Sequence, residues 1–201
     1  MVTQMKFKLF GTEIYVSFLF SAVITLMLAT DRTGMVMPTL FAILMHESGH
    51  LFAMWALECA PKRIKLIPAS VQITSPMTRR YKNDIAIAVC GPLVNFVLFL
   101  TFYLNYLAFK NELTLYYALL NLLIGAFNSL PVCGLDGGTV LQCLLAKRHG
   151  PDKAAVTVKI ITFITALLII TVALILALKD TFNISLFIIG IYLFVMTLIN
   201  K

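Results

Sequence analysis

Long apolar runs alternate with short polar segments along the whole chain. A membrane-spanning helix needs about 20 mostly apolar residues, and six runs approach or exceed that length. They cover residues 14–30, 35–57, 85–109, 113–131, 154–178 and 183–200. The first run is short, and Phe7, Leu9 and Phe10 could extend it. The pattern predicts an all-α polytopic membrane protein with six transmembrane helices.

Composition supports a membrane domain and leaves no room for a separate soluble one. The chain has 201 residues and is 60% hydrophobic. We expect one integral-membrane domain over residues 1–201, with a catalytic core at about 14–146 and accessory spans at about 154–200. The first run is longer than the apolar region of a usual signal peptide, so we expect it to stay uncleaved.

The basic residues predict the orientation of the chain. If the N-terminus is inside, inner segments carry Lys6, Lys8, Lys62, Arg63, Lys65, Arg79, Arg80, Lys82, Lys147, Arg148, Lys153 and Lys201. Outer segments carry only Arg32, Lys110 and Lys179. Because cytoplasmic loops are enriched in Lys and Arg, both termini are predicted to be cytoplasmic. The net charge of +7 is therefore explained by topology, and no nucleic-acid partner is expected.

Residues 58–84 form the longest polar segment, on the cytoplasmic side. Its middle, "RIKLIPASVQIT", is β-prone, and Pro68 and Pro76 would break it, so it predicts a short β-hairpin or edge strand. Its basic side chains would suit anionic lipid head groups. The cysteines lack a CxxC pair and lie at or near the same face, which predicts reduced thiols at Cys59, Cys90, Cys133 and Cys143.

The second run contains "HESGH", residues 46–50. Four residues are about one helical turn, so His46 and His50 share one face and can reach one Zn²⁺. Glu47 would meet a water on that metal. Small residues on or near this face, Ala42, Gly49 and Ala53, would let another helix approach closely. The alternative is a pair of core histidines satisfied by hydrogen bonds, but three ionisable groups in one span are costly.

A third zinc ligand is needed, and Asp136 in "NSLPVCGLDGG" is the best carboxylate for it. The alternative is that Asp136 caps a short helix at 137–146. His149 follows Lys147 and Arg148 and is expected to be solvated. To reach the histidines, residues 131–136 must fold back to membrane depth, where irregular backbone is tolerated only inside protein or along a wet cavity. This implies a pocket open to the cytoplasm.

Two further polar patterns lie in the spans. Asn121, Gly125 and Asn128 recur at helical spacing in the fourth run, which Pro131 then ends, and Gly134 permits unusual dihedrals.

In "CGPLVN", residues 90–95, Gly91 and Pro92 could form a packing notch, and Asn95 could hydrogen-bond between helices. The residues alone favour this notch over a functional site. Asn105, near the outer end of the same run, is expected to be structural.

Three motifs together resemble the site-2 protease family of intramembrane zinc metalloproteases. They are HExxH at 46–50, GPxxN at 91–95 and NxxPxxxLDG at 128–137, and the resemblance covers about residues 14–146. It implies His46, His50 and Asp136 as zinc ligands and Glu47 as the catalytic base or acid. It also implies that Asn95 helps to handle the substrate or the transition-state oxygen. Asn128 would contact the unwound substrate, and Pro131 would shape the turn.

Within that family the chain is most similar to the six-span sporulation branch, whose members cleave a membrane-associated pro-sigma factor. It has no PDZ-sized insertion between spans, and it stops at Lys201 without the CBS-type domain usual in that branch. The resemblance implies regulated intramembrane proteolysis of a membrane-associated protein substrate, with membrane regulator or inhibitor proteins as further partners.

The expected chemistry is peptide hydrolysis, in which Glu47 takes a proton from water and returns it to the leaving amine. A helical substrate must unwind first, and we hypothesise that the strand around Ile64–Ile73 then pairs with it. A zinc transporter is the first rival, although the polar residues cluster toward the inner half. A membrane scaffold without activity is the second, although no motif residue is missing.

Overall fold

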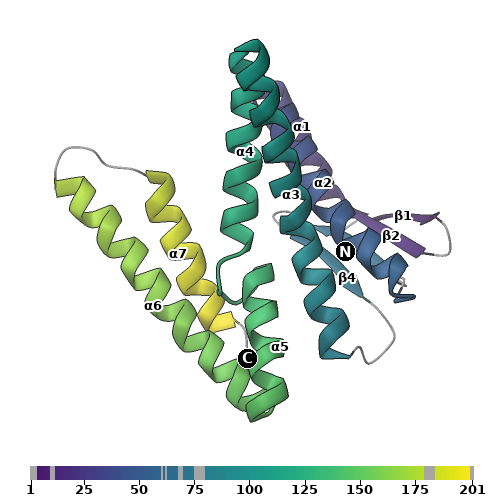
Figure 1. Ribbon diagram of the computed structural model, residues 1–201, viewed down its shortest axis with the longest axis vertical. Coiled ribbons are helices and arrows are strands. Elements are labelled where there is room, and N and C mark those ends of the chain that lie inside the picture. The colour runs from purple at the N-terminus through teal and green to yellow at the C-terminus, as the bar shows by residue number, and fades with distance from the viewer. Residues whose placement is uncertain are drawn as a thin grey trace. The chain divides into compact units, whose positions relative to one another are not determined.

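A computed structural model describes residues 4–9, 12–59, 61, 63–67, 70–74, 80–178 and 184–199. The chain divides into two compact units, Met1–Gly125 and Ala126–Lys201. The first contains four strands, β1 to β4, and most of four helices, α1 to α4; the second contains the end of α4 and helices α5 to α7 (Figure 1). Asp136 therefore belongs to the same unit as the two helices expected to be accessory.

The strands of the first unit form one sheet in the order β1-β2-β3-β4. Strands β1 (Gln4–Leu9) and β2 (Thr12–Ser17) are antiparallel, β2 runs parallel to β3 (Arg63–Ile67), and β3 is antiparallel to β4 (Ser70–Thr74). The hairpin predicted in residues 58–84 is therefore present. Pro68 and Pro76 lie outside the described residues.

The beginning of the first predicted span is wrong. Helix α1 covers only Phe18–Thr30, because residues 14–17 of the predicted span belong to β2. Phe7 and Leu9, which were expected to extend the span, lie in β1, and Phe10 lies outside the described residues. The reason is visible in "MKFK" and "EIYV", where polar and apolar residues alternate with the period of a strand. None of the side chains of α1 is buried.

The other five predicted runs are helical over most of their length. They correspond to α2 (Val36–Ala56), α3 (Tyr81–Phe109), α4 (Glu112–Asn128), α6 (Pro151–Leu178) and α7 (Ile184–Ile199), and α5 (Asp136–His149) lies between α4 and α6. Within the described residues, α3 and α6 are long and apolar enough to cross a membrane by length and composition.

Close packing of α2 on α3 builds the core around the histidines. Ala42 and Ala53 are buried, and a Cβ at Gly49 would come within 2.6 Å of the Cys90 carbonyl oxygen. The expected close approach of a second helix on this face is therefore confirmed, and that helix is α3. Helix α3 continues through Pro92 without ending.

Candidate metal centre

Helix α2 presents both histidines of the HESGH motif on one buried face. His46 and His50 are 5% and 8% exposed, and their Nε2 atoms are 3.2 Å apart. Two nitrogens that bind one Zn²⁺ at tetrahedral angles are about 3.3 Å apart, given Zn–N distances of about 2.0–2.1 Å. The rings thus already have the separation that a shared zinc ion requires.

The opposite nitrogen of each ring is held by a fixed acceptor. His50 Nδ1 lies 2.8 Å from the Ile87 carbonyl oxygen, and His46 Nδ1 lies 2.6 Å from Asn95 Oδ1. A carbonyl oxygen only accepts, so His50 carries its hydrogen on Nδ1. His46 also carries its hydrogen on Nδ1 if the atom of Asn95 that faces it is the amide oxygen and not the amide nitrogen.

Neighbouring acceptors determine the orientation of the Asn95 amide. Its Nδ2 donates to the Ala42 carbonyl oxygen at 3.3 Å and to Asn121 Oδ1 at 2.9 Å. Asn121 in turn donates to the Tyr117 carbonyl oxygen at 2.9 Å, and both asparagines are fully buried. Asn95 Oδ1 must therefore accept from His46 Nδ1. Both imidazoles direct the lone pair of Nε2 toward the shared space, as metal-ligating histidines do.

Gly91 provides the room that these rings occupy. A Cβ at Gly91 would overlap the His50 imidazole and lie 2.9 Å from His46 Nε2. The packing notch expected at Gly91 is thus filled by the imidazoles of His46 and His50. The GPLVN segment contributes space through Gly91 and a hydrogen bond through Asn95.

Asp136 begins α5 in the second unit. The N-cap position is Leu135, so Asp136 is the first helical residue and does not occupy the cap position that the alternative interpretation gave it. The loop before it turns at Gly134, whose φ of 85° is unfavourable for other residues. A Cβ at Gly137 would overlap the Ser129 carbonyl, and one at Gly138 would overlap the Val132 carbonyl. The first turn of α5 can therefore lie directly on the preceding loop.

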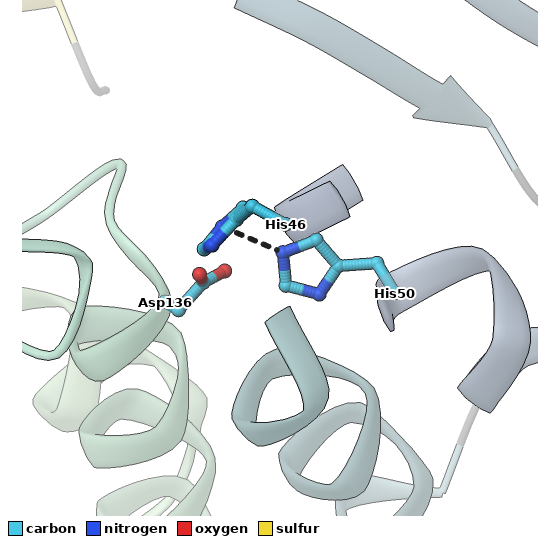
Figure 2. A group of neighbouring side chains, drawn as sticks. All are labelled: His46, His50 and Asp136. Atoms are coloured by element: carbon cyan, nitrogen blue, oxygen red, sulfur yellow. Dashed lines mark hydrogen bonds between the residues drawn. The ribbon is translucent and has the colours of Figure 1, made fainter. Parts of the chain in front are cut away.

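The three predicted ligands form a group (Figure 2). Ligating atoms of His46, His50 and Asp136 all lie within 4.8 Å of one another, and Figure 2 shows the carboxylate directed toward the imidazoles. Within the described residues, no other cluster of three or more His, Cys, Asp or Glu side chains that could hold a metal is found. Two imidazoles and one carboxylate are a donor set that fits a zinc site with an open fourth position.

The other predicted site residues have different environments. Glu47 follows His46 on α2 and is half-buried, and Asn128, the last residue of α4, is also half-buried. Pro131 is exposed in the loop before Asp136. His149 is exposed in the last turn of α5 and is not part of the metal group.

The buried contacts of Asn95 place it behind His46. Its amide is used by His46, Ala42 and Asn121, so these contacts do not support a direct role in handling the substrate oxygen. The polar stripe predicts Asn121 on one helix face but not its hydrogen bond to Asn95, and the sequence analysis assigns no role to Gly137 and Gly138. The adjacent glycines after a lone aspartate were the available signal for a close backbone approach.

Three comparisons bear on the family. The family model "Peptidase family M50" matches residues 110–172, which include Asp136. A zinc metalloprotease of Methanocaldococcus jannaschii is 27% identical in an alignment 163 residues long, which covers 74% of this chain and 47% of that protein. The chain thus spans about half the length of this curated relative.

A solved structure shares the fold. The site-2 protease from Methanocaldococcus jannaschii superposes with a TM-score of 0.69 over 97% of this chain and 94% of that chain, at 23% identity. Zn²⁺ is the cofactor that the family resemblance implies, and His46, His50 and Asp136 are positioned as a metal site for it. The family model and the curated zinc metalloprotease agree with the resemblance to the site-2 protease family that the three sequence motifs indicated.

Proposed function

We propose that this chain is an intramembrane zinc metalloprotease that cleaves a peptide bond within or next to a membrane segment of a protein substrate. The observation that carries the proposal is the grouping of His46, His50 and Asp136, with ligating atoms within 4.8 Å of one another. The carboxylate of Glu47 is the adjacent acid–base group on α2. The relationship to site-2 proteases supports the same activity.

In this proposal His46, His50 and Asp136 hold the metal and Glu47 moves the proton. Bound Zn²⁺ would act as a Lewis acid and lower the pKa of its water to about 7. Glu47 takes a proton from the attacking water and returns it to the amine that leaves. Asn95 accepts the Nδ1 hydrogen of His46, and the Ile87 carbonyl accepts that of His50. Both imidazoles therefore keep Nε2 unprotonated and able to bind the metal. The carboxylate of Asp136 supplies the negative charge of the ligand set.

Asn128 and Pro131 are proposed to act on the substrate side. Asn128 ends α4, and Pro131 lies in the loop that leads to Asp136. An amide at that position could bond to the exposed backbone of an unwound substrate, and the proline restricts the turn that follows. Both roles are implied by the family resemblance, and in the structure they are supported only by where Asn128 and Pro131 lie along the chain.

Strand pairing with the substrate requires a free sheet edge. Strand β3 is hydrogen-bonded to β2 on one side and to β4 on the other, so pairing with the substrate is excluded for the part of Ile64–Ile73 that lies in β3. In the described part of the chain, β4 is an outer strand of the sheet. We propose that an extended substrate pairs with Ser70–Thr74. Proline at alternate positions of β4 should slow cleavage without unfolding the protein, and unchanged turnover would exclude this role.

The substrate class follows from the branch that the sequence resembles. We propose a membrane-associated regulatory precursor, such as a pro-sigma factor processed during sporulation, cleaved by regulated intramembrane proteolysis. Membrane regulator or inhibitor proteins would control access. Incubation of the purified chain with candidate precursors, with and without chelator, tests this. Chelator-sensitive cleavage of a single-span protein but not of a pro-sigma factor would reject the substrate and retain the activity.

For the topology we propose six membrane passes with both termini cytoplasmic, supported by the distribution of Lys and Arg. Helix α1 has 13 residues and a length of about 20 Å at about 1.5 Å per residue, which is short for a hydrocarbon core of about 30 Å. The sheet that precedes it must therefore lie close to the membrane surface.

Register gives that sheet one apolar and one basic face. Phe7, Ile14 and Ile64 are cross-strand neighbours, whereas Lys8, Glu13 and Arg63 form the adjacent row on the other face. Met5 and Phe7 are half exposed. On the other face the Glu13 carboxylate accepts a hydrogen bond from Lys6 Nζ at 2.7 Å, which lowers the pKa of Glu13. We propose that the apolar face contacts acyl chains while the basic face meets anionic head groups.

Neighbouring positions on β1 provide a matched test of this membrane contact. In a Trp55→Phe background, Phe7→Trp should be quenched by lipids brominated on their acyl chains, and Lys8→Trp should not. Anionic vesicles should strengthen the difference, because the basic face attracts their head groups. Equal quenching at the two positions would contradict the orientation.

Glu47→Gln tests the protease against its rivals. The variant should keep zinc but lose cleavage by at least about 10²–10⁴-fold, because general acid–base catalysis is removed. Ser48→Ala is the control, since Ser48 is exposed and its hydroxyl bonds only to the Met45 carbonyl oxygen among the described contacts. Zinc transport or partner binding that survives in Glu47→Gln, together with no proteolysis by the wild type, would favour a transporter or a scaffold.

A further inference from the structure

Helix α6 holds the loop that carries Asp136. We infer that Thr162, on α6, is a positioning residue for the carboxylate ligand, so that α6 and α7 set the geometry of the metal site. The inference rests on the proposed function only in taking Asp136 as a zinc ligand. All the contacts that support it lie within the second unit, Ala126–Lys201.

A hydrogen bond ties the loop backbone to Thr162. The Cys133 N–H donates to Thr162 Oγ1 at 2.8 Å, and the Thr162 hydroxyl donates to the Val158 carbonyl oxygen at 2.7 Å. Thr162 is fully buried, so water cannot replace the bond to Cys133 without repacking. The hydroxyl therefore links α6 to a peptide group three residues before Asp136.

Apolar contacts hold the same loop on both sides of that hydrogen bond. Val132 is fully buried and Leu135 is 8% exposed, and both pack in one cluster with Ala166 of α6 and Leu193 of α7. The backbone of the loop is thus attached to α6 at Cys133, and the side chains of Val132 and Leu135, on either side of Cys133, attach the loop to α6 and α7.

The loop in turn is in direct contact with the helix that Asp136 begins. Gly137 and Gly138 leave no space for a Cβ against the carbonyls of Ser129 and Val132. Because the loop and the first turn of α5 touch through backbone, a displacement of the loop must displace the first turn of α5. Thr162 therefore acts on Asp136 through the chain itself, although it does not touch the metal group.

Three variants of α6 separate this role from general stability. Thr162→Val keeps the shape of the side chain but removes the acceptor for Cys133, and Thr162→Ser keeps the acceptor. Thr165→Val is the matched control, because the Thr165 hydroxyl bonds only to the Ile161 carbonyl oxygen of its own helix among the described contacts. Zinc affinity is measured on the full chain in detergent by competition with a chelator.

We expect Thr162→Val to bind zinc about three- to tenfold more weakly, less than the roughly 10–100-fold cost of losing a direct partner of a ligand. Thr162→Ser and Thr165→Val should bind as the wild type does. In an Asp136→Ala background, Thr162→Val should cause no further loss of zinc affinity. A general structural defect would instead lower the zinc affinity of the Asp136→Ala protein further.

The outcomes separate the inference from the proposed function. A wild-type chain that binds no zinc would overturn the proposed function. Wild-type affinity in Thr162→Val, or an equal loss in Thr165→Val, would overturn the role of Thr162 while leaving the metal site intact. If Thr162→Val does not fold, Thr162→Ala is measured in the same way, and its affinity decides the question.

Discussion

Asn95 Oδ1 accepts a hydrogen bond from His46 Nδ1 at 2.6 Å between α3 and α2. The bond joins the GPxxN motif to the HExxH motif, which are separated by more than forty residues in the sequence. Since Ala42 and Asn121 fix the Asn95 amide, the acceptor is already oriented when a metal arrives. Orientation of a ligating imidazole by such a partner raises metal affinity.

Asn95→Leu should weaken zinc binding by about 10–100-fold, because His46 loses the acceptor that selects its tautomer. Cleavage should fall at limiting zinc and recover in part at saturating zinc. The measurement is a chelator competition with the purified chain. Asn105→Leu is the control, since Asn105 is exposed on the same helix. Unchanged affinity in Asn95→Leu would contradict the role of this hydrogen bond.

Gly91→Ala should abolish zinc binding and lower the stability of the metal-free protein less than Gly49→Ala does, because its methyl group meets the ends of side chains and not backbone. The added methyl group would overlap the His50 ring, whereas alanine in a helix interior favours the helix by about 0.5–1 kcal/mol over glycine. Zinc content and thermal unfolding with excess chelator measure the two effects separately.

Gly49→Ala gives the matched comparison for Gly91→Ala. Its methyl group would meet the Cys90 backbone and the Val94 side chain, so this variant should lose stability even without metal. A Gly91→Ala protein that retains bound zinc would show that the imidazoles do not need this space.

Removal of zinc should lower the unfolding temperature of the wild type. Binding to the folded state alone stabilises it by about 2.7 kcal/mol when free zinc is 100 times Kd. The Asp136→Ala protein should show a smaller shift at the same zinc concentration, because its affinity is lower. Thermal unfolding in detergent, with zinc and with chelator, gives both shifts. Equal shifts in the two proteins would argue against Asp136 as a ligand.

Acid should destabilise the turn between α1 and α2. The Asp31 carboxylate accepts hydrogen bonds from the backbone N–H groups of Thr33, Gly34 and Val36, and the bond from Val36 contributes most to lowering the pKa of Asp31 to about 2. Because the folded pKa lies below the ordinary value of 3.8, this stabilisation is present above about pH 4 and is lost as pH falls toward 2.

Asp31→Asn tests this pH dependence. The variant should unfold at a lower temperature than the wild type at pH 6, and the difference should shrink as pH falls to 2. Thermal unfolding over this range in an acid-stable detergent measures it. A difference that is constant with pH would mean that the charge of Asp31 does not contribute.

Alternation and spacing explain both the success and the failure of the prediction near the N-terminus. The run beginning at residue 14 was long enough to suggest a helix, but polar and apolar residues alternate with the period of a strand at Lys6 and Lys8 and again at Glu13 and Tyr15, and β1 and β2 form there. The mean hydropathy of a window does not show this alternation, because the same apolar residues give the same mean whether they lie in a strand or in a helix.

The sequence by itself determined the positions of His46 and His50 on one side of α2, because residues four apart on a helix lie together whatever surrounds it. Only the tertiary structure decided that Gly91 makes room for the imidazoles and Asn95 orients one of them. It alone paired Thr162 with the loop before Asp136. In helices that are apolar nearly all round, periodicity does not indicate which face meets which neighbour, so such contacts depend on packing between distant segments.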